Sequence, residues 1–75
     1  MQDVRVNIII ERDEDGCYAY SPDLKGCQSQ GNSLEEVKVN IKEAVELYLE
    51  TLDRHEIPAL RERDIFTMAL ELKVA

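Results

Sequence analysis

Residues 18–50 read YAYSPDLKGCQSQGNSLEEVKVNIKEAVELYLE, and they join a short strand and turn directly to an amphipathic helix. Ser33 and Glu36 have the Ser-x-x-Glu spacing of a capping box, in which each side chain accepts a hydrogen bond from the other residue's backbone N–H. Apolar residues then recur at spacings of three and four and share one helical face, namely Leu34, Val37, Ile41, Ala44, Val45, Tyr48 and Leu52. The pattern predicts a helix from Ser33 to about Asp53 that packs on a sheet.

The residues before this helix predict the sheet. Residues 4–11 have the alternation expected of a strand with one buried face, in which Val4, Val6, Ile8 and Ile10 alternate with Arg5, Asn7 and Glu11. Asp15-Gly16 favours a tight hairpin turn, so residues 17–20 should return as a second, antiparallel strand. Pro22 and Gly26 then predict a loop, after which residues 27–30 can form a short third strand.

A last strand is predicted near the C-terminus. Between residues 66 and 74, Phe, Met, Leu, Leu and Val alternate with Thr, Ala, Glu and Lys. The expected order is therefore β-β-β-α-β. This order predicts an α+β two-layer domain, with a small antiparallel-rich sheet and one long helix packed on one face.

Length and charge limit the classes of function. A chain of 75 residues forms one domain with a thin core, which favours self-association. Its net charge of -7 argues against a surface that binds phosphate groups and favours a basic protein partner. There is no apolar stretch of signal-peptide or membrane length, so we expect a cytoplasmic protein.

The sequence offers no set of catalytic residues. A nuclease of the RNase H type needs carboxylates that converge on divalent metal, including one on the first strand, and residues 4–10 contain none. Glu11, Asp13, Glu14 and Asp15 cluster at the predicted hairpin tip, where solvated turn residues are the simpler interpretation. His55 stands without a nucleophile placed by any motif. We therefore predict no catalytic residue, no metal ligand and no cofactor.

The two cysteines lack metal-ligand spacing and companion ligands. No neighbouring cation or histidine lowers the pKa of Cys17 or Cys27 in the sequence, so neither is expected to be a reactive thiol. Both are interpreted as small, reduced residues that contribute to packing.

The same central stretch resembles the HicB family of antitoxins. In that family an aromatic strand leads into a Pro-Asp-Leu-x-Gly-Cys loop, a Gln-Gly-(Asp/Asn)-(Ser/Thr) turn, and a helix that opens with Glu-Glu and carries Glu-Ala near its middle. The matching residues here are Pro22, Asp23, Leu24, Gly26, Cys27, Gln30, Gly31, Asn32, Ser33, Glu35, Glu36, Glu43 and Ala44. Lys25 and Val37 are mild departures, standing where the family often has proline and alanine. After Arg54 only a short loop followed by an apolar strand matches.

The resemblance implies a partial RNase H-like fold and a non-catalytic antitoxin of a type II toxin-antitoxin system. HicB antitoxins bind and neutralise HicA toxins, which are small RNA-cleaving proteins, and they commonly form dimers or tetramers. Full-length HicB proteins usually add a C-terminal DNA-binding domain. We expect a single HicB-like domain over residues 1–75 without that addition, and no direct binding of nucleic acid by this chain.

Two other functions remain open at this point. One is a stand-alone oligomeric HicB-like protein that binds a different partner, and a neighbouring HicA-like reading frame would argue against it. The other is a degenerate RNase H-like nuclease, which would require convergent carboxylates.

Candidate contact residues follow from the strands and the loop. Tyr18 and Tyr20 share one strand face, where aromatic rings serve a core or an interface equally well. In the loop, Asp23 can hydrogen-bond main-chain N–H groups in an Asx-type turn and Leu24 can fill the edge of the core, or both can contact a partner. The predicted partner-binding residues are Tyr18, Tyr20, Asp23, Leu24, Asp13 and Asp15. The predicted oligomer interface consists of Ile9, Ile65 and Ala69, which oppose the main apolar sets of the first and last strands.

Overall fold

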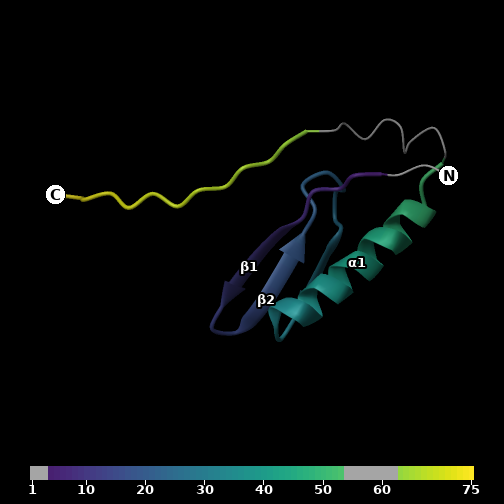
Figure 1. Cartoon of the computed structure of the whole chain (residues 1–75), viewed down its shortest axis with the longest axis horizontal. Coiled ribbons are helices and arrows are strands. Elements are labelled where there is room, and N and C mark those ends of the chain that lie inside the picture. The colour runs from purple at the N-terminus through teal and green to yellow at the C-terminus, as the bar shows by residue number, and fades with distance from the viewer. Residues whose placement is uncertain (1–3, 54–62) are drawn as a thin grey trace.

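The structure is a computed structural model that describes residues 4–53 and 63–75. Three strands, β1 (Ile9–Asp13), β2 (Gly16–Tyr20) and β3 (Gln28–Gly31), precede one long helix, α1 (Leu34–Glu50). The strands form an antiparallel sheet in the order β1-β2-β3, and α1 lies across one face of it (Figure 1). The predicted α+β two-layer fold is confirmed.

The core lies between the sheet and the helix. Its buried residues come from β2, the following loop and α1, and they are Cys17, Ala19, Leu24, Cys27, Val37 and Ile41. Partly buried residues surround this cluster, including Val6, Ile8 and Ile10 on the N-terminal side. Most of the predicted helical face therefore packs on the sheet, although Leu34 is exposed at the first turn.

The start of α1 differs in one detail from a capping box. Ser33 is the N-cap, and its Oγ accepts the Glu36 N–H at 3.1 Å as predicted. The Glu36 carboxylate, however, accepts the N–H of Asn32 at 3.2 Å rather than that of Ser33. Glu35 and Glu36 also lie in the first turn, where the helix dipole favours negative charge. Local signals therefore define the N-terminal end of the helix. At the other end, the last helical residue is Glu50 rather than the predicted Asp53.

The first strand begins later in the chain than predicted, and the hairpin turn lies one residue earlier. Strand β1 begins at Ile9, and residues 4–8 precede it without strand pairing. The turn falls at Glu14 and Asp15, between the paired residues Asp13 and Gly16. Asp13 Oδ1 accepts the Asp15 N–H at 2.8 Å, which stabilises this turn. The Asp13 side chain thus helps to set the turn, and with it the pairing of β1 with β2, which composition alone does not define.

The strand predicted over residues 66–74 is not formed within the single chain. We call residues 66–74 the C-terminal segment; it runs away from the sheet in Figure 1, and no residue of it is assigned to a strand. Its five large apolar residues are all exposed. The alternation identified a sequence suited to a strand, but a strand also requires a neighbouring edge, which the segment lacks here.

Candidate partner-binding face

The sheet has one covered face and one open face. Cys17 and Ala19 of β2 are buried beneath α1, so the alternating residues Tyr18 and Tyr20 project to the opposite side. Strand pairing extends this side, because Glu11 and Gln30 lie opposite Tyr18. We call this side the open face; it consists of Ile9, Glu11, Asp13, Tyr18, Tyr20, Gln28 and Gln30.

Two tyrosines lie at the centre of the open face. The rings of Tyr18 and Tyr20 have centroids 5.7 Å apart and are tilted by 33°. Tyr18 is 40 % exposed, and its hydroxyl donates a hydrogen bond to Oε1 of Gln28 on the adjacent strand. The tyrosines thus present apolar surface with polar tips, a combination common at protein interfaces.

Acidic residues border these tyrosines. A concavity of about 740 Å³ at the hairpin end of the sheet is lined by Tyr18 and by four carboxylates, those of Glu11, Asp13, Asp15 and Glu36. Its lining contains no lysine or arginine. Within residues 4–53 and 63–75, no group of three or more His, Cys, Asp and Glu has the geometry of a metal site. This acidic border is suited to basic groups on a partner.

The structure separates the predicted contact residues into two groups. Tyr18, Tyr20, Asp13 and Asp15 lie together on or beside the open face. Leu24 is 2 % exposed and belongs to the core, which leaves almost none of its side chain available to a partner. His55 lies outside the described residues.

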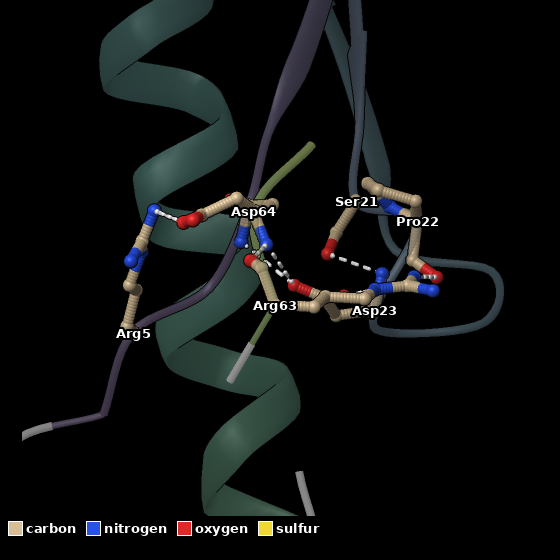
Figure 2. Close-up of polar contacts among 7 residues, drawn as sticks. Arg5, Ser21, Pro22, Asp23, Arg63 and Asp64 are labelled. Carbon is tan, nitrogen blue, oxygen red and sulfur yellow. Dashed lines mark hydrogen bonds and ion pairs between the residues drawn. The ribbon is translucent and has the colours of Figure 1, made fainter. Parts of the chain in front are cut away.

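Asp23 joins three parts of the chain that are distant in sequence. One carboxylate oxygen accepts the Asn7 backbone N–H at 2.8 Å and the Asn7 side-chain amide at 3.1 Å. The other oxygen accepts a hydrogen bond from the Nε–H of Arg63 at 2.8 Å, and Arg63 donates a second hydrogen bond to the Pro22 carbonyl at 3.0 Å (Figure 2). The predicted Asx-type turn is thus replaced by long-range bonds, while the hydroxyl of Ser21 accepts the Asp23 N–H locally.

The ionisation of Asp23 reflects this environment. Burial acts to raise its pKa, but the hydrogen bonds from Asn7 and the charge and hydrogen bond of Arg63 outweigh burial and lower the pKa below 3.8. The Asp23 side chain is only 8 % exposed, whereas that of Arg63 is 51 % exposed. Asp23 is therefore an ionised, structural carboxylate.

The cysteines occupy the covered side of the sheet. Cys17 and Cys27 are both free and buried, as the sequence predicts. Burial raises the pKa of the Cys27 thiol above its ordinary value of 9.0. Such a thiol is protonated at neutral pH, which makes it a poor nucleophile.

The predicted oligomer residues lie on different parts of the molecule. Ile9 is half-buried on the open face, Ile65 is half-buried just before the C-terminal segment, and Ala69 is exposed within that segment. Sequence reasoning missed three neutral or acidic members of the open face, Glu11, Gln28 and Gln30. Only the strand register could have identified them, because their position beside Tyr18 depends on which residues pair.

None of the described residues forms a helix of the length and apolar character that crossing a membrane requires. No solved structure shows significant similarity to the chain. A UPF0150 protein of Helicobacter pylori is 46% identical over 70 residues, which are 93% of this chain and 97% of that protein. A UPF0150 protein of Synechocystis is 43% identical over 68 residues, or 89% of this chain and 85% of that one.

A protein of Haemophilus phage HP1, described as an uncharacterized 14.9 kDa protein in the rep-hol intergenic region, is 40% identical over 53 residues. The match covers 68% of this chain and 40% of the phage protein. Residues 6–71 match the family model for the HicB-like antitoxin of bacterial toxin-antitoxin systems. These residues span all three strands, the helix and most of the C-terminal segment. The chain therefore belongs to the HicB-like antitoxin family.

Proposed function

We propose that this protein is a non-catalytic antitoxin that binds and neutralises a small, basic, RNA-cleaving toxin of the HicA type. The match of residues 6–71 to the HicB-like antitoxin family is the observation that carries this proposal. The action requires only that the antitoxin cover the toxin's active surface. It acts in the cytoplasm in this proposal, because that is where such a toxin meets its RNA substrate.

The open face is the surface that we assign to the toxin. It combines the exposed ring of Tyr18 with the carboxylates of Glu11, Asp13 and Asp15. A toxin that binds RNA carries positive charge where the phosphates lie, and opposite charges on two proteins accelerate their encounter and disfavour wrong partners. The net charge of -7 acts in the same direction over the whole molecule.

A titration of the toxin tests this proposal. Adding the purified protein to a HicA-type toxin and labelled RNA should abolish cleavage near one equivalent of binding sites. Continued cleavage at large excess of folded protein would contradict the proposal. The association rate should also fall as salt is added, because mobile ions screen the attraction between exposed charges.

Charge reversal tests the assigned surface. Glu11→Lys places a positive charge on the open face and should weaken inhibition by about tenfold or more, since like charges at an interface cost several kcal/mol. Glu43→Lys is the matched control, because Glu43 is an exposed glutamate of α1 outside the open face. Equal loss of inhibition in both variants would show that net charge, rather than this surface, governs binding.

We also propose that the protein self-associates as a homodimer or tetramer. Helix α1 covers one face of the sheet, and five large apolar residues of the C-terminal segment are exposed. Exposed apolar surface of this kind is typical of protein interfaces. Light scattering at micromolar concentration should report at least twice the mass of one chain, and a monomer at that concentration would contradict this part of the proposal.

A further inference from the structure

The C-terminal segment presents a complete apolar strand face to solvent. Its side chains alternate, and the apolar members are 89 %, 80 %, 68 %, 76 % and 91 % exposed at Phe66, Met68, Leu70, Leu72 and Val74. A two-residue period is that of a strand, in which every second side chain points to one side. The segment therefore has the form of a strand that is ready to pair and to bury one face.

An apolar groove lies beside the free edge of β1. It has a volume of about 370 Å³ and runs between residues 4–10 and the helix. Its apolar lining includes Val6, Ile8, Ile10, Ile41, Val45 and Leu49. Among residues 4–53 and 63–75, only β2 pairs with β1, so one edge of β1 has no strand beside it. The groove and the free edge thus lie on the same side of the molecule.

Two ion pairs join the residues just before the C-terminal segment to the region at the start of the sheet. Arg63 Nε lies 2.8 Å from Asp23 Oδ1, and Arg5 lies 3.0 Å from Asp64 Oδ1. The Arg63 carbonyl also accepts the Asn7 side-chain amide at 2.9 Å. From these contacts, which Figure 2 shows, the segment leaves the domain, as Figure 1 shows. Its apolar residues therefore lie outside the groove of their own chain.

We propose that the C-terminal segment of one copy adds as a strand to the free edge of β1 in a second copy, with its apolar face in that copy's groove. The C-terminal segment of the second copy pairs with β1 of the first copy in the same way. This inference rests on the self-association proposed above and specifies how it occurs. It assigns to residues 66–74 the role of the missing fourth strand, supplied by the partner.

Size and stoichiometry favour a second copy of this chain as the occupant of the groove. The segment has nine residues and spans roughly 30 Å when extended, which is close to the reach of residues 4–13 along the groove and β1. Lys38 and Lys42 line the groove together with Glu46. Glu71 and Lys73 lie on the side of the segment opposite its apolar face, so they would stay outside the groove. Because each chain has one segment and one groove, a two-fold exchange satisfies both and closes the assembly.

A substitution in the exposed segment tests the exchange without disturbing the core. Leu70→Lys should raise the dissociation constant of the dimer by about tenfold or more, because an unpaired charge would have to enter an apolar groove. Thr67→Lys is the matched control, since Thr67 lies on the opposite side of the same segment, and it should leave the constant within about threefold. Sedimentation equilibrium gives both constants, and circular dichroism checks that both variants remain folded. Equal behaviour of the two variants would overturn the proposal.

Isotope-filtered NMR identifies which chain fills the groove. A dimer reassembled from carbon-13-labelled and unlabelled chains should give methyl contacts between the segment of one chain and Ile8 or Ile10 of the other. Contacts only within one chain would overturn the exchange, because the segment would then have folded back on its own sheet. A dimer whose segment makes no contacts would also overturn it while leaving self-association intact. A monomer would overturn both.

Discussion

The carboxylate of Asp23 accepts the backbone N–H of Asn7 at 2.8 Å, although the two residues are 16 positions apart. The bond fastens the chain just before β1 to the loop that follows β2. Arg63 donates a hydrogen bond to the other oxygen of Asp23, so the same carboxylate also contacts the chain just before the C-terminal segment. One carboxylate therefore bridges the chain before β1 and the chain before residues 66–74.

Removing this carboxylate should destabilise the fold. Asp23→Ala leaves the half-buried Asn7 N–H without its acceptor, and an unsatisfied group of this kind costs about 1–3 kcal/mol of unfolding free energy. Asp23→Asn retains one acceptor oxygen and should lose less. Urea denaturation followed by circular dichroism measures both values. Glu43→Ala, an exposed change on α1, is the control and should alter stability by less than about 0.5 kcal/mol.

The contribution of Asp23 should depend on pH in a defined direction. Because folding lowers its pKa below 3.8, the ionised form stabilises the folded state above that pH, and this stabilisation is lost as the pH falls through the lowered pKa. The difference in unfolding free energy between the natural protein and Asp23→Asn should be constant near neutrality and shrink below about pH 4. A difference that grew in acid would contradict the assigned ionisation.

Gly31 should resist substitution because of steric contact with the helix. A Cβ atom at this position would lie 2.8 Å from the Val37 nitrogen and 3.1 Å from its Cα, so the backbone of α1 would have to move. Gly31→Ala should therefore lower the unfolding free energy by about 1–3 kcal/mol. Gln30→Ala changes the neighbouring exposed side chain and serves as the control. Matching urea midpoints for the two variants would show that the helix can move at little cost.

The N-cap can be tested by a graded series. Ser33→Ala removes the acceptor of the Glu36 N–H and should cost about 1 kcal/mol of stability. Ser33→Asp restores an acceptor at the same position and should recover most of that loss, whereas Ser33→Gly should cost only a few tenths of a kcal/mol. Thermal or urea unfolding ranks the three variants. Failure of Ser33→Asp to recover stability would show that the cap contributes through something other than this hydrogen bond.

Both thiols should be protected in the folded protein. Cys17 and Cys27 are buried, and the raised pKa of Cys27 reduces its thiolate further. A thiol reagent such as Ellman's reagent should react slowly at pH 8 in native conditions and should titrate two thiols per chain after denaturation. Lys25→Cys places a third cysteine in the exposed loop and should react rapidly. Rapid reaction of the natural protein would show that the core opens readily.

Local sequence determined the helix, its first residue and the general class of fold. Ser33 and Glu36 act over a few residues, and the spacing of Val37, Ile41 and Val45 follows from the period of an α-helix, so neighbouring residues sufficed. The sequence also predicted that Tyr18 and Tyr20 lie on the same side of β2, because side chains two residues apart in a strand point the same way. These features require no knowledge of distant contacts.

Tertiary structure decided the register of β1, the role of Asp23 and the fate of residues 66–74. A strand's bounds depend on its cross-strand partner, and the Asn7 contact of Asp23 joins segments that the sequence does not relate. Alternation specified that residues 66–74 suit a strand but could not specify which edge they join. In the described chain they join no edge, and only the folded chain brings the preceding Arg63 and Asp64 together with Asp23 and Arg5.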